Sequence, residues 1–390
     1  MRVKPADRTD SIQEYYFSQK LRQIDQMRKS GADIISLGIG SPDMPPSENT
    51  ISRLSEEAAR TSSHGYQSYN GIPALRQAFT EWYKTYFNVV LDPENEILPL
   101  MGSKEGIMHI SMAFVNPGDE VLVPDPGYPT YSSVTNLVGG RIRYYDLCEE
   151  NGWLPDLARL EASGTGKVKI MWINYPHMPT GAKASRTFFE QLVAFCLKHN
   201  ILLVNDNPYS FILNNEYLSL LEADGAMDIA LELNSLSKSH NMAGWRIGMV
   251  AGNRDYIKTI LKVKSNMDSG MFRAMQVAAA GALGNPSSWY EEINLVYKRR
   301  RKIVEEIMDV MKCRFDKKQT GLFVWGRIPE EIPDCESFVD EILLKAHVFI
   351  TPGFIFGKNG NRYIRISLCA DEPALLISKT KITDYLSSKS

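Results

Sequence analysis

The sequence predicts an α/β fold with a mainly parallel central sheet, helices on both faces of it, and a smaller α+β domain. Short apolar runs rich in β-branched residues recur at 120–123, 168–173, 201–204, 229–233 and 247–251. Helix-like segments lie between several of these runs, at 104–114 and 187–199. Continuous apolar strands that alternate with helices are typical of a parallel sheet covered on both faces.

The chain of 390 residues is long for a single core, and its pattern changes near residue 286. A long charged helix is expected at 290–311, followed by strands and one further helix that together form an α+β unit. The first residues lack the strand–helix rhythm and are expected to pack against that unit. We therefore predict an N-terminal segment over 1–45, a large domain over 46–286 and a small domain over 287–390.

Composition argues against several classes of protein. The net charge is −2 and no large block of like charges occurs, which gives no reason to expect a nucleic-acid or membrane partner. The short basic run 298–302 is expected on the exposed face of a helix. The N-terminus has no apolar core of a secretory signal, and the five cysteines are scattered without metal-ligand spacing. We expect a cytoplasmic protein without a metal site.

Polar and aromatic side chains follow four of these apolar runs, at the point where each predicted strand ends, and a fifth group of the same kind lies at 102–104. Ligand sites of open α/β sheets lie at the carboxyl ends of the strands. One such group of residues is weak evidence of a site, whereas five groups together predict a shared one. They are 102–104, 126–129, 174–181, 206–209 and 235–238.

The segment SLSKSHNMAGWRIG, over 235–248, carries the strongest chemical signal. A lysine at a sheet edge that is screened from water can have a lowered amine pKa and can form a Schiff base with an aldehyde, which Lys238 would do. The guanidinium of Arg246 and the hydroxyls of Ser235 and Ser237 would suit a phosphate dianion. A lone lysine is usually a solvated surface group, but these neighbours favour the catalytic interpretation.

Two further groups fit the same ligand. Gly102, Ser103 and Lys104 open a helix whose free N–H groups could seat a phosphate, although a Gly-Ser pair is also a common helix cap. Asp206 could pair with a ring nitrogen and Tyr209 could donate its phenol to a ring oxygen, with a helix cap as the alternative role for Asp206.

Tyr128, between two prolines, could stack on a planar ligand or could simply form a rigid corner. Arg365 lies in the predicted strand RYIRISL and could bind a substrate carboxylate, whereas Arg362 could be its solvent-facing neighbour. The G-x-G in LGIGSPD lacks the third glycine of a dinucleotide site, since Asp43 stands there, and receives little weight.

With these residues assembled, the chain resembles the fold-type I aminotransferases that depend on pyridoxal 5′-phosphate, in the aspartate aminotransferase superfamily. The resemblance runs from ISLGIGSPD to RYIRISL, and the S-x-S-K-x7-R-x-G segment is highly specific. GSKEGIMH, VLVPDPGYPTY and VKSNMDSG are most similar to LL-diaminopimelate aminotransferases and related bacterial aspartate aminotransferases.

The resemblance implies roles for individual residues. Lys238 would hold pyridoxal 5′-phosphate as an internal aldimine, and Arg365, with the backbone around Gly40, would hold the α-carboxylate of an amino acid or 2-oxo acid. Tyr66 would reach the phosphate of a partner subunit, which implies a homodimer with shared sites. Tyr15 matches, more loosely, a tyrosine near the substrate. The cofactor contacts implied are Gly102, Ser103, Lys104, Tyr128, Asp206, Tyr209, Ser235, Ser237 and Arg246.

Two departures from the family pattern stand out. The family loop reads N-P-T-G, and its Asn donates to the ring oxygen of the cofactor; here Met178 occupies that position in NYPHMPTG. A thioether can only accept a hydrogen bond. We therefore expect a raised aldimine pKa, unless Asn174 or His177 replaces the donor. In addition, 66–71 contains no acidic residue of the kind that diaminopimelate enzymes use for the distal amine.

The leading prediction is an aminotransferase for dicarboxylic donors, such as aspartate and glutamate, or for a broad range of donors. A dicarboxylic substrate needs a second cation, for which Lys104, Lys262, Lys264 and Arg273 are candidates. The alternatives are a C–S β-lyase, an LL-diaminopimelate aminotransferase and a weakly active cofactor-binding protein.

Overall fold

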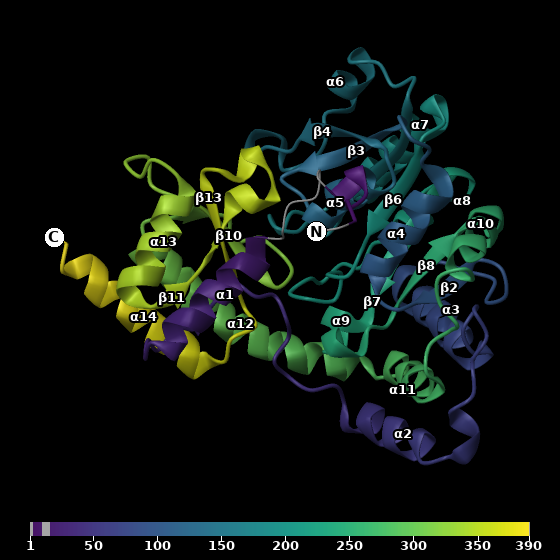
Figure 1. Cartoon of the computed structure of the whole chain (residues 1–390), viewed down its shortest axis with the longest axis horizontal. Coiled ribbons are helices and arrows are strands. Elements are labelled where there is room, and N and C mark those ends of the chain that lie inside the picture. Colours follow the sequence, from purple (N-terminus) through teal and green to yellow (C-terminus); the bar gives the residue numbers. More distant parts are fainter. Residues whose placement is uncertain (1–2, 10–15, 390) are drawn as a thin grey trace.

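A seven-stranded, mainly parallel sheet forms the centre of the computed structural model, which describes residues 3–9 and 16–389 (Figure 1). The strands follow the order β2-β8-β7-β6-β5-β3-β4, and only β8 runs antiparallel to its neighbours. Their bounds are β2 Ile97–Leu100, β3 Glu120–Asp125, β4 Arg141–Asp146, β5 Val168–Ile173, β6 Leu202–Asp206, β7 Ala230–Ser235 and β8 Gly248–Gly252. The predicted α/β class is confirmed.

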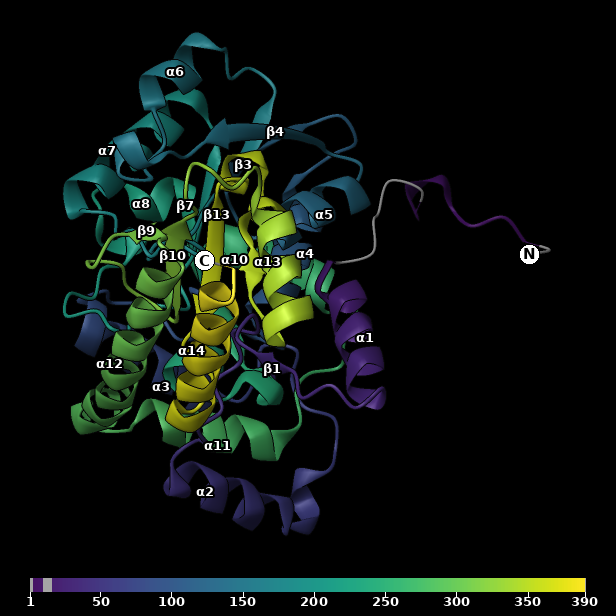
Figure 2. The ribbon, with the colours of Figure 1, turned by 90° about the vertical axis from the view of Figure 1, so that its left-hand side faces the viewer.

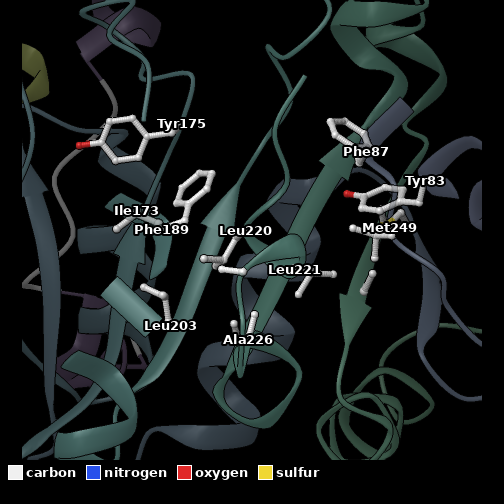
Figure 3. Close-up of a cluster of buried hydrophobic side chains, with 14 of the residues drawn as sticks. Tyr83, Phe87, Ile173, Tyr175, Phe189, Leu203, Leu220, Leu221, Ala226 and Met249 are labelled. Carbon is white, nitrogen blue, oxygen red and sulfur yellow. The ribbon is translucent and has the colours of Figure 1, made fainter. Parts of the chain in front are cut away.

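Both faces of this sheet are covered by apolar side chains, because successive residues of a strand point to opposite faces. On β5, Met171 and Ile173 enter one buried cluster, while Ile170 and Trp172 enter another. Figure 3 shows the first cluster, in which Ile173 of β5 and Leu203 of β6 lie beside Phe189 from a covering helix. This explains why the central strands read as continuous apolar runs rather than alternating ones.

The helices of this half of the chain divide between the two faces. The first cluster includes side chains from α3, α7 and α11, and the second includes side chains from α4, α5 and α10. The bounds are α2 Glu48–Ala58, α3 Pro73–Phe87, α4 Ser103–Phe114, α5 Pro129–Leu137, α6 Leu157–Ala162, α7 Arg186–His199, α8 Ala226–Ile229, α9 Leu236–Ser239, α10 Arg254–Lys264 and α11 Arg273–Leu283.

The C-terminal part forms a four-stranded sheet of order β12-β13-β10-β9 with three helices, drawn in green and yellow in Figure 1. The bounds are α12 Ser287–Val310, β9 Arg314–Phe315, β10 Phe323–Arg327, α13 Cys335–Ala346, β11 Val348–Phe349, β12 Thr351–Pro352, β13 Tyr363–Ser367 and α14 Glu372–Ser387. We propose that the N-terminal segment ends at residue 45 and that the large domain ends at residue 286.

The N-terminal segment lies against this C-terminal part. Strand β1, Ile35–Ser36, pairs in parallel with β11, and Ile24 of α1, Tyr16–Lys29, packs with Leu343 and Phe349. Nζ of Lys20 lies 2.6 Å from Oδ1 of Asp340 on α13. Figure 2 shows α1 alongside α13.

One expectation is wrong in part. Within the basic run 298–302, Arg300 is buried and donates from Nη1 and Nη2 to the carboxylate of Asp43, at 2.6 and 2.7 Å. A helix of 24 residues turns one side chain in three or four toward the core, so a short charged run cannot lie entirely on its exposed face. The interaction holds the segment after Gly40 against α12.

None of the helices in the described residues is long and apolar enough to cross a membrane. All five cysteines are unpaired, and four of them are buried. The cytoplasmic location stays a prediction.

Candidate active site

A cavity of about 570 Å³ lies at the carboxyl edge of the central sheet, between that edge, the N-terminal segment and the C-terminal sheet. It collects side chains that are distant in the sequence. Of the residues predicted from the sequence, those that line it are Gly40, Ser103, Lys104, Tyr128, Met178, Asp206, Tyr209, Ser235, Ser237, Lys238, Arg246 and Arg365.

Among the described residues, two of those predicted from the sequence do not line this cavity. Gly102 lies directly behind it, at the start of α4. Tyr66 is 93% exposed and is not among the residues that line the cavity, so its predicted contact with a partner subunit stays a prediction. Tyr15 falls outside the described residues, so its predicted place near the substrate stays a prediction.

Lys238 follows β7 directly, on the short helix α9. Its Nζ donates to the carbonyl of Gly40 at 2.5 Å, which ties the N-terminal segment to the sheet edge. Burial lowers the pKa of the Lys238 ammonium, and the positive charges of Arg365 and Arg246 lower it further. An amine of lowered pKa in a cavity has the properties of a nucleophile and a general base.

Asp206 ends β6 and is almost fully buried. Its Oδ2 accepts from the phenol of Tyr131 at 3.0 Å, while Oδ1 has no hydrogen-bond partner among the described residues. Burial raises the pKa of Asp206 to about 7, although the Tyr131 hydrogen bond opposes this shift. A buried carboxylate oxygen without a partner is costly unless a donor, such as a protonated ring nitrogen, meets it there.

The other end of the cavity is suited to an anion. Gly102 has φ +85°, and a Cβ at this position would lie 2.3 Å from Nη2 of Arg246, so only glycine lets that guanidinium approach the start of α4. No side chain caps this helix start, which leaves its N–H groups directed outward. Ser235 and Ser237 hydroxyls lie 2.8 Å apart on the same side.

Arg365 is buried on β13, held from several sides. Nη2 donates to the carbonyl of Gly38 at 2.8 Å, and Cζ lies 3.9 Å from the ring centroid of Phe323 and 4.7 Å from that of Phe356. The aromatic faces stabilise the cation and restrict its rotation. A guanidinium fixed in this way can donate two parallel hydrogen bonds to a carboxylate.

Met178 lines the same cavity as Asp206 and Arg365. It is buried, its N–H donates to Oδ1 of Asn174 at 2.8 Å, and its sulfur accepts from Nη1 of Arg365 at 3.3 Å. Of the two candidate substitutes for the missing donor, His177 does not line the cavity and bonds Thr180. Asn174 lines the cavity, and one of its amide N–H groups is used by the carbonyl of Asp206. Only Asn174 is therefore positioned to compensate.

The sequence reasoning missed several residues of the cavity. Tyr131, which bonds Asp206 and stacks on Trp172 at 5.1 Å, lies only three residues after Tyr128 and could have been found from that spacing. The apolar wall residues carry no chemical signal in the sequence, and only the fold reveals them; they are Phe17, Leu21, Ile39, Phe323 and Phe356.

A cluster of possible metal ligands lies near the start of α4. The ligand atoms of Glu105, His109 and Asp268 lie within 4.8 Å of one another. Nζ of the buried Lys264 donates to both oxygens of Asp268, at 2.7 and 2.9 Å. The ammonium of Lys264 therefore supplies a positive charge beside these carboxylates, as a metal ion would.

Comparison with known proteins identifies the family. The model of the family described as "Aminotransferase class I and II" matches residues 32–376 of this chain. An LL-diaminopimelate aminotransferase from Oleidesulfovibrio alaskensis is 42% identical over 373 residues, which cover 95% of this chain and 96% of that protein. A substrate-bound BacF structure from Bacillus subtilis superposes with a TM-score of 0.93 at 34% identity, covering 98% of both chains. An aromatic aminotransferase structure from Pyrococcus horikoshii gives 0.86 at 28% identity, covering 94% of this chain and 99% of the other.

Enzymes of this family depend on pyridoxal 5′-phosphate. The cavity fits that group: the open oxygen of Asp206 matches a pyridinium nitrogen, the uncapped start of α4 beside Arg246 matches a phosphate, and Lys238 matches an aldehyde. A planar ring with a basic nitrogen and a phosphate group requires a buried acidic partner and a phosphate cradle in one cavity, and both are present here. The chain therefore belongs to the class I and II aminotransferases and is a transaminase that depends on pyridoxal 5′-phosphate.

Proposed function

We propose that this enzyme transfers the α-amino group of an amino acid to a 2-oxo acid, with Lys238 moving the α-proton and Arg365 binding the α-carboxylate. One observation carries the proposal: Nζ of Lys238, the open oxygen of Asp206 and the guanidinium of Arg365 share one cavity. These are the base, the electron-withdrawing partner and the substrate anchor that transamination requires.

The chain's own residues would divide the work as follows. Pyridoxal 5′-phosphate, when bound, supplies a ring that stabilises negative charge at the substrate α-carbon. Asp206 would keep the ring nitrogen protonated, and Tyr209 would donate to the ring oxygen. Burial lowers the pKa of Lys238, which favours the neutral amine that can accept the α-proton. The phosphate would lie between Arg246 and the start of α4.

The identity of the donor needs direct measurement. A dicarboxylic donor needs a second cation, and among the four candidates only Lys104 lines the cavity. Lys264 donates to Asp268, Arg273 lies 2.7 Å from Glu57, and neither lines it, nor does Lys262. Within the family, fold does not fix the substrate, since similar proteins are named for different amino acids.

A second candidate function, LL-diaminopimelate transamination, is favoured by the names of curated relatives at 38–42% identity. Against it, residues 66–71 read YQSYNG and provide no carboxylate for a distal ammonium. A charged distal group that enters without a counter-charge would weaken binding by several kcal/mol.

We also propose that the enzyme works as a homodimer in which Tyr66 contacts the phosphate site of the partner subunit. Large apolar side chains are exposed on two adjoining segments: Tyr66 and Tyr69 on one, Met267 and Phe272 on the other. The segments adjoin because a Cβ at Gly270 would lie 2.7 Å from the carbonyl oxygen of Gln67. Exposed apolar clusters of this kind mark interaction surfaces.

The test is a single-turnover experiment with the enzyme loaded with pyridoxal 5′-phosphate. Aspartate, glutamate, alanine, aromatic amino acids and diaminopimelate are each added without a 2-oxo acid, and the cofactor spectrum is followed. We expect conversion to the amine form and its reversal by a 2-oxo acid. Release of pyruvate and ammonia without an acceptor would identify a β-lyase instead, and an unchanged spectrum with every donor would refute the proposal.

A further inference from the structure

The part of the cavity that remains for the substrate side chain is walled by apolar groups. Arg365 and Lys238 would fix the α-carboxylate and the α-carbon, and the cofactor would occupy the floor between Asp206 and Arg246. The remaining lining residues are mostly carbon-rich. Those from the N-terminal segment and the C-terminal part are Phe17, Leu21, Ile39, Phe323 and Phe356.

This wall surrounds the carboxylate anchor directly. The rings of Phe323, Phe356 and Phe17 have centroids 3.9, 4.7 and 5.8 Å from Cζ of Arg365. A substrate that places its carboxylate on Arg365 therefore brings its side chain into contact with carbon. Apolar contact of this kind is favourable in proportion to the apolar surface that it removes from water.

The wall is held in place by the fold. Phe17 and Leu21 are one helical turn apart on α1, so they face the cavity together. Ile39 precedes Gly40, whose carbonyl accepts the hydrogen bond from Lys238. A Cβ at Gly40 would lie 2.3 Å from Cζ of Phe323, so the glycine allows the ring to close over the segment.

Apart from Arg365 and Lys238, which would meet the α-carboxylate and the α-carbon, no charged residue of the described lining belongs to this wall. The acidic residue of the described lining is Asp206, and the cations are Lys104, Lys238, Arg246 and Arg365. Lys104 is adjacent to Ser103 at the start of α4, on the anion-binding side. Neither a distal carboxylate nor a distal ammonium would meet an opposite charge on the apolar wall.

We propose that the enzyme prefers amino donors with a large apolar or aromatic side chain, of the size of leucine, methionine or phenylalanine, over dicarboxylic donors and diaminopimelate. This inference rests on the proposed function and narrows its substrate class. A charged side chain that loses water against carbon without a partner is disfavoured, whereas an apolar one gains from the same transfer.

Two measurements test the preference. The first compares single-turnover rate constants over concentration for leucine, methionine and phenylalanine with those for aspartate, glutamate and diaminopimelate. We expect at least a 10-fold advantage for the apolar group. A faster reaction with any of the three charged donors overturns the inference but leaves transamination intact, whereas the absence of reaction with all donors overturns the proposed function.

The second measurement is binding without turnover. Titration calorimetry compares 3-phenylpropionate with succinate as ligands of the loaded enzyme, and we expect the first to bind at least 10-fold more tightly. Leu21→Arg, which places a cation on the wall, should narrow or reverse this ratio. Leu376→Arg on α14, where the leucine is 50% exposed and far from the cavity lining, should leave it unchanged. Equal ratios in wild type and Leu21→Arg would contradict the assignment of the wall.

Discussion

The sulfur of Met178 lies 3.3 Å from Nη1 of Arg365, and both side chains are buried. Thioether sulfur is a weak acceptor, so this contact orients the guanidinium without holding it strongly. A substrate carboxylate, as a charged acceptor, would displace the sulfur readily. Met178 therefore helps to orient Arg365 before a substrate carboxylate binds. It cannot, however, donate a hydrogen bond to the ring oxygen of the cofactor, as an asparagine would.

Met178→Asn should lower the pKa of the visible absorption band of the loaded enzyme. The asparagine N–H would stabilise the negative ring oxygen, and one charge-assisted hydrogen bond is worth about 1.5–3 kcal/mol, or about one to two pKa units. A spectrophotometric pH titration of wild type and variant measures the shift.

Met112→Asn serves as the matched control, because Met112 is 48% exposed on α4 and does not line the cavity. Its titration should overlay that of the wild type. An unchanged pKa in Met178→Asn would mean that the donor is already replaced, for which Asn174 is the available side chain.

Arg365→Lys should impair the reaction with amino acids and spare the cofactor. Lysine keeps the charge but cannot form the bidentate pair, and the loss of one charge-assisted hydrogen bond costs about 1.5–3 kcal/mol, roughly 10- to 150-fold in kcat/KM. The spectrum of the bound cofactor should be unchanged, and a primary amine without a carboxylate should react equally with both forms. Arg299→Lys, at an exposed pair with Glu372, is the control. Equal losses for the amine and the amino acids would argue against a carboxylate role.

Asp206 should make the stability of the cofactor-free protein depend on pH. Its pKa is raised by burial from 3.8 to about 7, so the folded state holds a proton that the unfolded state releases at lower pH. The contribution is complete below about pH 4 and is lost as the pH rises toward 7, at about 1.4 kcal/mol for each pKa unit. Urea unfolding at pH 5 to 8 should show Asp206→Asn gaining on the wild type as the pH rises. The exposed Asp224→Asn should show a constant difference, and a constant difference for Asp206→Asn would contradict the raised pKa.

Apolar periodicity was enough to predict the central strands. The runs at 120–123, 168–173 and 247–251 became β3, β5 and β8 within a residue or two, because strands buried on both faces leave an uninterrupted apolar signal. Strand β4, Arg141–Asp146, was missed because it is an edge strand whose side chains are partly exposed. Strand β2 was missed because it is short and contains Pro99.

The residues of the site also divide into those that the sequence predicted and those that it did not. Lys238, Asp206 and Arg246 carry reactive groups at strand ends, so chemistry and topology together predicted that they meet. The apolar wall could not be predicted, because Phe17 and Phe356 are 339 positions apart and look like ordinary core residues in the sequence. Contacts of this kind depend on how the N-terminal segment packs against the C-terminal part, where β1 and β11 form a separate two-stranded sheet.

Lys264→Met should destabilise the protein strongly. Lys264 is 1% exposed, and its ammonium donates to both oxygens of Asp268, beside Glu105. Removing the buried cation leaves two partly buried carboxylates together without it, and breaking a buried pair costs up to about 3–5 kcal/mol. Methionine fits the volume, so the effect would come from charge rather than from a cavity. Lys262→Met, an exposed position two residues earlier on α10, should stay within about 0.5 kcal/mol of the wild type in urea unfolding. The loss should shrink at low pH, where protonation of Asp268 removes its negative charge, and a pH-independent loss would instead indicate a packing effect.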